Sequence, residues 1–186
     1  GVRGMSCGVP EVLEAYESFW RELVGGGNSV IVPTPAYMPF WSVPKLYDVD
    51  VIEIEMLQSG DAETGEAQWV FDFDAIERAF AAGCHAFVLC NPHNPVGKVL
   101  TLGEELRLSD LAAQYDVRIF NDEIHAPFVF EGKHIPFPTI SEQAALQSMT
   151  ATSASTSFNI PGTKCAQVLL TNPPDHYMWV AKAVRA

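Results

Sequence analysis

Long apolar runs, paired cysteines and an excess of positive charge are all absent from this chain of 186 residues. No stretch reaches the roughly 18 apolar residues that suggest a membrane-spanning helix, and no signal-peptide pattern opens the sequence. The 11 basic residues are outnumbered by 23 acidic residues, and the net charge is −12. Because nucleic acids and anionic membranes attract clustered Lys and Arg, this balance argues against both as partners.

The cysteines show no metal-binding pattern, because none of them forms a C-x-x-C pair or has a histidine at metal-ligand spacing. The sequence therefore predicts no metal site. Free thiols buried in a reducing compartment are the expected state, and we expect a cytoplasmic protein. The four cysteines are Cys7, Cys84, Cys90 and Cys165.

What the chain does contain is a regular alternation of strand and helix signals without repeats or linkers. Strands are expected at 29–32, 50–56, 86–90, 117–120, 149–152 and 167–170. Helices are expected from Pro10 to the glycines at 25–27, from Phe73 to Gly83, and from Thr101 through Leu111. Thr101 and Glu104 have the spacing of a capping box. The alternation predicts an α/β fold with a mostly parallel central sheet and helices on both faces, in a single unit spanning 1–186.

Four polar clusters follow apolar strands, and ligands of parallel sheets bind where such strands end. Taken singly, each cluster has an ordinary structural explanation as a packed loop aromatic, turn-forming asparagines, or capping acids and serines. Their joint occurrence at successive strand ends favours a ligand site. The clusters are 33–40 (PTPAYMPF), 91–97 (NPHNPVG), 121–127 (NDEIHAP) and 153–162 (SASTSFNIPG).

These four patterns, in this order, resemble those of the fold-type-I pyridoxal-phosphate (PLP) enzymes of the class I/II aminotransferase superfamily. Within that superfamily the chain is most similar to the cystathionine β-lyase-like C–S lyases. His125 supports this placement, because typical aminotransferases more often have Tyr at that position. The resemblance extends from about Val9 to Leu170 and implies a PLP-binding large domain.

The resemblance also implies a role for each matching residue. Tyr37 would stack on the pyridine ring of PLP, and Asn94 and His125 would face its phenolic oxygen. Asp122 would pair with the pyridinium nitrogen and keep it protonated, so that the ring remains an electron sink.

The phosphate of PLP would lie near the hydroxyl groups of Ser153 and Ser155. The loop at 7–9, before the first helix, would add backbone N–H donors, although its motif is poorly preserved.

Thr156 departs from the family pattern, because it occupies the position of the Schiff-base lysine. Threonine has no amine, so it supplies neither the covalent anchor for PLP nor the base that moves the substrate proton. Lys164 is the nearest lysine and is expected to be a surface residue beyond the turn at 161–162. We therefore expect PLP to bind non-covalently at best and the chain to be inactive as it stands.

The implied activity is β-elimination from S-substituted cysteines, which yields pyruvate, ammonia and a thiol. Two alternatives remain open: an aminotransferase of the same fold, and a non-catalytic PLP-fold remnant or binding protein. Relative to the family, the N-terminal segment and the C-terminal small domain are expected to be absent, and Arg185 lies too early to be the substrate-binding arginine. Family members are homodimers, so we also expect the isolated chain to associate.

Overall fold

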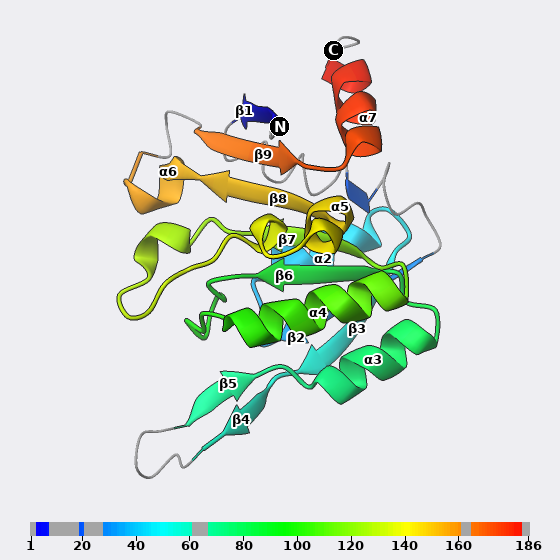
Figure 1. Cartoon of the computed structure of the whole chain (residues 1–186), viewed down its shortest axis with the longest axis vertical. Helices are drawn as coiled ribbons and strands as arrows, with labels where there is room; N and C mark the ends of the chain where they lie inside the picture. The colour runs from blue at the N-terminus through cyan, green and yellow to red at the C-terminus, as the bar shows by residue number, and fades with distance from the viewer. Residues whose placement is uncertain (1–2, 8–18, 21–27, 61–66, 161–164, 184–186) are drawn as a thin grey trace.

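The computed structural model describes residues 3–7, 19–20, 28–60, 67–160 and 165–183, and its central feature is a seven-stranded sheet (Figure 1). The spatial order of the strands is β1-β9-β8-β7-β6-β2-β3. Neighbours from β8 to β3 run parallel, whereas β9 is antiparallel to both β8 and β1. The strands are β1 (Arg3–Cys7), β2 (Ser29–Thr34), β3 (Asp50–Glu55), β6 (Ala86–Cys90), β7 (Arg118–Asp122), β8 (Ser148–Ser153) and β9 (Ala166–Leu170).

Apolar residues cover both faces of the sheet, because successive side chains of a strand point to opposite sides. In β2, Val30 and Val32 face one core while Ile31 faces the other. In β6, Val88 faces the same core as Val30, while Phe87 faces the same core as Ile31. All five residues of β6 are buried, as expected of a central parallel strand. The continuous apolar run at 86–90 is therefore the sequence signature of a strand covered on both faces.

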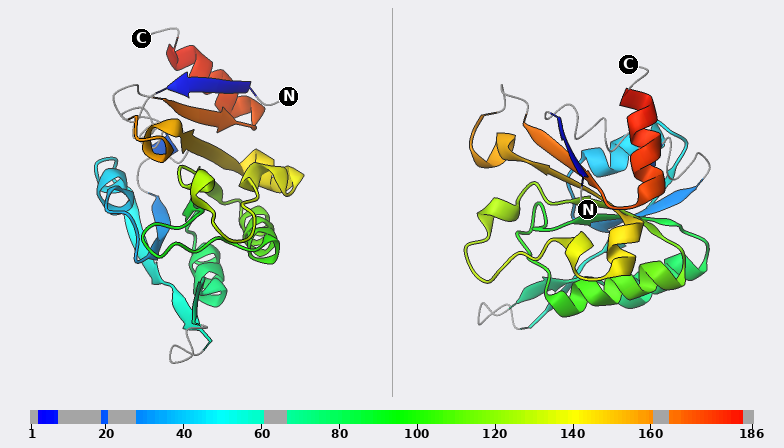
Figure 2. Two further views of the ribbon diagram at one scale, coloured as in Figure 1. Left: turned by 90° about the vertical axis from the view of Figure 1, so that its left-hand side faces the viewer. Right: turned by 45° about the horizontal axis from the view of Figure 1, so that its top comes forward.

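Helices cover each face of this sheet (Figures 1 and 2). One core includes Ile76 of α3, Leu108 of α4 and Ala144 of α5. The opposite core includes Phe40 of α2, with Trp179 of α7 packed against it. The helices are α2 (Pro39–Lys45), α3 (Phe73–Ala81), α4 (Leu102–Gln114), α5 (Glu142–Gln147), α6 (Ala154–Ser157) and α7 (Pro173–Ala183), with 3-10 turns η2 (Ala126–Phe128) and η3 (Phe137–Thr139).

The predicted α/β class and mostly parallel sheet are confirmed, and each of the six predicted strands is present within two residues of its expected ends. The predicted capping box is present, because the Thr101 hydroxyl accepts a hydrogen bond from Glu104 N while the Glu104 carboxylate accepts one from Thr101 N. Of the predicted helix from Pro10 to the glycines at 25–27, only residues 19 and 20 are described, so this prediction is not tested.

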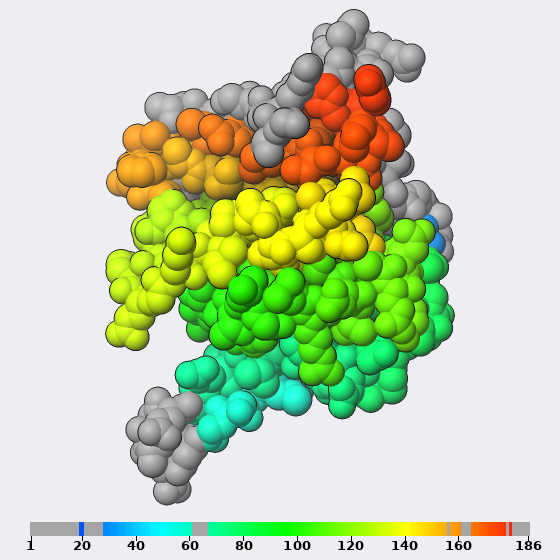
Figure 3. Space-filling view, in the orientation of Figure 1, coloured from blue at the N-terminus to red at the C-terminus, as the bar shows by residue number. Residues whose placement is uncertain are grey.

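Some elements were not predicted. No helix was expected in the cluster at 33–40, but this cluster continues into α2, with Pro39 in the first turn, where a missing N–H removes no helical bond. The hairpin of β4 (Leu57–Ser59) and β5 (Gln68–Val70) was also missed, and it projects from the body of the molecule (Figure 3). Within the described residues, no helix has the length and apolar character needed to cross a membrane.

Candidate functional site

The four polar clusters follow β2, β6, β7 and β8, which are consecutive parallel neighbours in the sheet. Their carboxyl ends consequently lie along one edge, the edge at which parallel sheets bind ligands. The ladder register makes the proximity concrete, because Asp122 at the end of β7 lies between Cys90 of β6 and Ala151 of β8. Backbone topology, more than any single side chain, thus assembles the candidate site.

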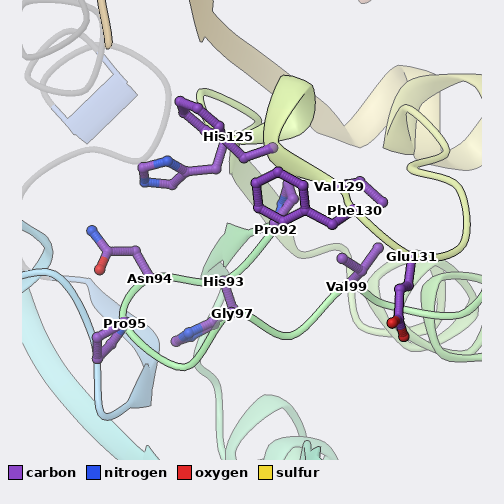
Figure 4. Close-up of a pocket in the computed structure, with 11 residues that line it drawn as sticks. Pro92, His93, Asn94, Pro95, Gly97, Val99, His125, Val129, Phe130 and Glu131 are labelled. Carbon is purple, nitrogen blue, oxygen red and sulfur yellow. The ribbon is translucent and has the colours of Figure 1, made fainter. Parts of the chain in front are cut away.

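Asn94 and His125 line the same pocket, which has a volume of about 510 Å³. Asn94 lies in the loop after β6, and His125 immediately precedes η2. Figure 4 shows the Asn94 amide and the His125 imidazole turned toward the same side. Burial lowers the pKa of His125, so the imidazole is neutral near pH 7 and can donate from one nitrogen while the other accepts.

Asp122 is a buried carboxylate with little compensation for its charge. Its side chain is 7% exposed, and Oδ1 accepts a hydrogen bond of 3.0 Å from Ile124 N. No cation within the described part of the chain pairs with it. Burial raises the pKa of Asp122 to about 6, and neighbouring Glu123 adds to the increase. A cationic group brought to this carboxylate would therefore be strongly favoured.

Tyr37 lies between β2 and α2 with 47% of its surface exposed. Its ring makes an edge-to-face contact with Phe40 at a centroid distance of 5.7 Å, which leaves much of the phenol accessible. An exposed aromatic face beside a ligand edge can stack on a flat, conjugated ligand. The residues that line the Asn94–His125 pocket do not include Tyr37.

Ser153 and Ser155 are buried and already engaged with backbone. Ser153 Oγ donates to Cys165 O at 2.9 Å, and Ser155 Oγ accepts from Cys165 N at 3.0 Å. The two hydroxyl groups join the turn after β8 to the beginning of β9. Ser153 also lines a second, smaller pocket of about 200 Å³. Their predicted contact with a phosphate stays a prediction.

Thr156 belongs to the short helix α6, and nothing further is described of its side chain. Lys164, together with Gly8 and Val9 of the predicted N–H donors, lies outside the described residues. Within the part of the chain that the structure describes, no group of three His, Cys, Asp or Glu side chains could hold a metal ion.

Two potentially reactive groups at this edge are held in their neutral forms. Burial, with Asp122 nearby, raises the pKa of the Cys90 thiol far above its usual value, so Cys90 is not a thiolate nucleophile. Burial and the charge of Lys98 lower the pKa of His93 to about 4. Cys84 and Cys90 are free and buried as predicted, whereas Cys165 is free but only half-buried.

Sequence reasoning missed one wall of the pocket, which comes from the segment after His125. Phe128 and Phe130 are exposed large aromatics on this wall, with exposed fractions of 40% and 91%. A run of apolar residues directly after the D-E-I-H pattern was the available signal. The missed wall is formed by Phe128, Val129, Phe130 and Glu131, and Val99 from the loop after β6 also lines the pocket.

Comparison with known proteins supports the same picture. The chain is 37% identical over 171 residues to a cystathionine beta-lyase of Corynebacterium glutamicum, covering 92% of the chain and 43% of that relative. It is 28% identical to kynurenine–oxoglutarate transaminase 3 of Rattus norvegicus, covering 76% of the chain and 32% of that protein. The crystal structure of cystalysin from Treponema denticola, which contains pyridoxal 5'-phosphate, superposes with a TM-score of 0.80 at 31% identity, covering 93% of this chain and 42% of that one.

The chain thus spans less than half of the length of these relatives. The sequence also matches the family described as aminotransferase class I and II over residues 5–186. This match includes all four polar clusters and every strand of the central sheet except the first two residues of β1. The protein belongs to the aminotransferase class I and II family.

Proposed function

We propose that residues 1–186 form the PLP-binding core of a large domain of the C–S β-lyase type, which binds its cofactor without a covalent anchor. The observation that carries this proposal is Asp122, a buried carboxylate without a described cationic partner at the ligand edge of the sheet. The pyridine nitrogen of PLP, when protonated, supplies the missing positive charge. When bound, PLP provides a conjugated ring that accepts electrons from a carbanion.

The remaining residues of the site fit the other parts of such a ring. Asn94 and His125 line one pocket and can both donate hydrogen bonds to an oxygen on the ring. Tyr37 offers an exposed aromatic face for stacking. Ser153 ends β8 and Ser155 follows it, on the strand next to β7, and in this proposal their hydroxyl groups would bind the phosphate of the cofactor. In this proposal Tyr37 holds the ring by its face, Asn94 and His125 hold it by its oxygen, and Asp122 holds it by its nitrogen.

Thr156 determines what this chain does not do. Its hydroxyl is a poor base near pH 7, so it cannot remove the α-proton of a bound amino acid at a useful rate. It also has no amine with which to hold the cofactor through a covalent bond. We therefore expect the site to retain affinity for PLP while catalysis is reduced by several orders of magnitude.

The substrate class we propose is a cysteine that carries a substituent on sulfur, of which cystathionine is an example. Similarity to a cystathionine beta-lyase supports this choice, as does His125 at the position where aminotransferases more often have Tyr. The second candidate is an aminotransferase, which the similarity to a kynurenine transaminase favours. Lyase and aminotransferase differ in outcome: the Cβ–S bond breaks in the first, and the amino group is transferred in the second.

A chimera tests the assignment, with this core replacing the matching segment of the Corynebacterium glutamicum relative. Thr156→Lys in the chimera should release pyruvate and a thiol from cystathionine, because it restores the base and the anchor. The matched control is the same chimera with Thr156, for which we expect a rate lower by at least about 10²–10⁴-fold. Transamination without elimination would favour the aminotransferase. Equal rates in both chimeras would show that the residue at position 156 does not limit catalysis.

A further inference from the structure

The loop that carries Asn94 is closed at its two ends by a single side chain. Asn91, directly after β6, accepts a hydrogen bond of 3.0 Å from Leu100 N through Oδ1. The backbone N–H of Asn91 donates to Asp122 O at 3.0 Å. Asn91 is completely buried, so water does not compete for these bonds. The position of Asn94 in the pocket therefore depends on how firmly Asn91 is held.

The side chain of Glu105 in α4 holds the side chain of Asn91 in place. Asn91 Nδ2 donates to Glu105 Oε1 at 2.7 Å, a short bond between two buried side chains. Glu105 has no exposed surface, and its Oε2 has no hydrogen-bond partner among the described residues. A fully buried carboxyl with one bonded and one unbonded oxygen is an unusual choice for a helix face that otherwise packs Leu108 and Leu111. It fits a group that is retained to position Asn91.

The surroundings of Glu105 contain charges of both signs, and they come from α4, from the 91–100 loop and from the segment after β7. Glu104 precedes it on α4 and pairs with Lys98 at 2.8 Å. From the segment after β7, Glu123 and His134 face the same interior, with Glu123 Oε2 3.3 Å from His134 Nε2. Burial raises the pKa of Glu105 to about 7, with Glu123 and Glu104 adding to the increase while His134 and the Asn91 bond oppose it.

We propose that Glu105 is a positioning residue that acts through Asn91 to hold the 91–100 loop, and with it Asn94, closed most firmly when its carboxyl is protonated. The connection from this loop to PLP affinity rests on the proposed function. The effect on the loop itself is independent of it, because the Glu105–Asn91–Leu100 chain of hydrogen bonds lies within the protein.

The sign of the pH dependence follows from the direction of the shift. A carboxyl whose pKa is raised by folding stabilises the closed structure fully below its unfolded value, near 4.5, and loses that contribution as the pH rises through about 7. Above pH 7 the ionised carboxyl favours opening toward water. The loop should therefore become less protected as the pH rises from about 4.5 to 7.5, and its protection should level off at higher pH.

Hydrogen exchange of the Leu100 amide measures loop closure directly, in the protein without cofactor. In E105Q the amide oxygen still accepts from Asn91 but cannot ionise, so the ratio of wild-type to E105Q exchange rates should rise with pH through 7. Comparing the two proteins at each pH cancels the intrinsic pH dependence of exchange. In E105A the acceptor is lost, and we expect Leu100 to exchange about tenfold faster at pH 7. D110A removes an exposed carboxyl from the same helix. It should change neither the exchange rate of the Leu100 amide nor the pH dependence of that rate.

The readout also distinguishes positioning from general stability, because the amide of Ile119 in β7 should keep its exchange rate in E105Q. In a parallel titration monitored by absorbance, PLP should bind about tenfold more weakly to E105A than to the wild type or D110A. A wild-type to E105Q ratio that is flat across pH, or equal Leu100 exchange in E105A and wild type, would overturn the proposal. If E105A does not fold, the E105Q ratio decides. Failure of every form to bind PLP would overturn the proposed function and the link to the cofactor, while the exchange ratio would still decide the role of Glu105.

Discussion

At the scale of single residues, Asp122 is a side chain whose protonation equilibrium is set by the fold. It is almost fully buried, and burial raises its pKa from 3.8 to about 6. A carboxyl with a raised pKa contributes stability that is present below the unfolded value of 3.8 and is lost as the pH rises through about 6. The protein without cofactor therefore carries an unfavourable charge at neutral pH, which a bound cation would offset.

Asp122→Asn removes the charge of this side chain while keeping its shape. The amide oxygen can still accept from Ile124 N, while the buried negative charge disappears. At pH 8 we expect the variant without cofactor to be more stable than the wild type by about 1–3 kcal/mol, measured by urea denaturation. At pH 4 the difference should nearly vanish, because the wild-type carboxyl is then protonated.

The same variant should bind PLP more weakly, since the counter-charge for the ring nitrogen is gone. Asp110→Asn, on the exposed side of α4, is the matched control and should change neither stability nor binding. A variant less stable than the wild type at pH 8 would show that Asp122 contributes structurally as an anion, against this interpretation.

The position of the candidate residues at one edge of the sheet was predictable from the sequence, but their partners within the protein were not, and their roles toward PLP stay predictions. Asn94, Asp122 and His125 were identified from short patterns, and the structure places all three at the predicted edge. The link from Asn91 to Glu105 joins two segments that no pattern connects, 14 residues apart. Such contacts depend on tertiary packing, which brings Glu105 of α4 against Asn91.

At the scale of elements, apolar runs predicted the strands well because each central strand is covered on both faces. The hairpin β4–β5 was not predictable on this basis, since the residues of β4 are all exposed and no core imposes a pattern on them. Helix α2 was not predicted because the prolines of the cluster at 33–40 favour a turn over a helix. Pro39 stands in the first turn, where proline is tolerated, and Pro44 stands in the last.

Between elements, the predicted phosphate-binding serines have a structural task that can be measured. Ser155→Ala would leave the N–H of half-buried Cys165 without its acceptor. We expect a loss of about 1–3 kcal/mol in the free energy of unfolding without cofactor, measured by urea denaturation. Ser42→Ala, which removes an exposed hydroxyl from α2, should be nearly neutral. A neutral Ser155→Ala would show that the junction of β8 and β9 does not depend on this bond.

At the scale of the whole molecule, a mostly parallel sheet brings four distant sequence clusters to one edge, where they form a candidate PLP site. Homodimer formation stays a prediction, and the aromatic wall at Phe128 and Phe130 is an apolar surface that association could cover. We propose that PLP binds without a covalent bond, because the candidate ring-binding residues are present while residue 156, the expected position of the anchor, is a threonine.

Titration with PLP, followed by borohydride reduction and mass spectrometry of peptides, tests this claim most directly. The wild-type chain should bind PLP, as followed by absorbance, and yield no reduced cofactor adduct, whereas Thr156→Lys should bind more tightly and yield an adduct at position 156. An adduct on Lys164 of the wild type would contradict the account, because another lysine would then serve as the anchor. Absence of PLP binding by both proteins would equally contradict it.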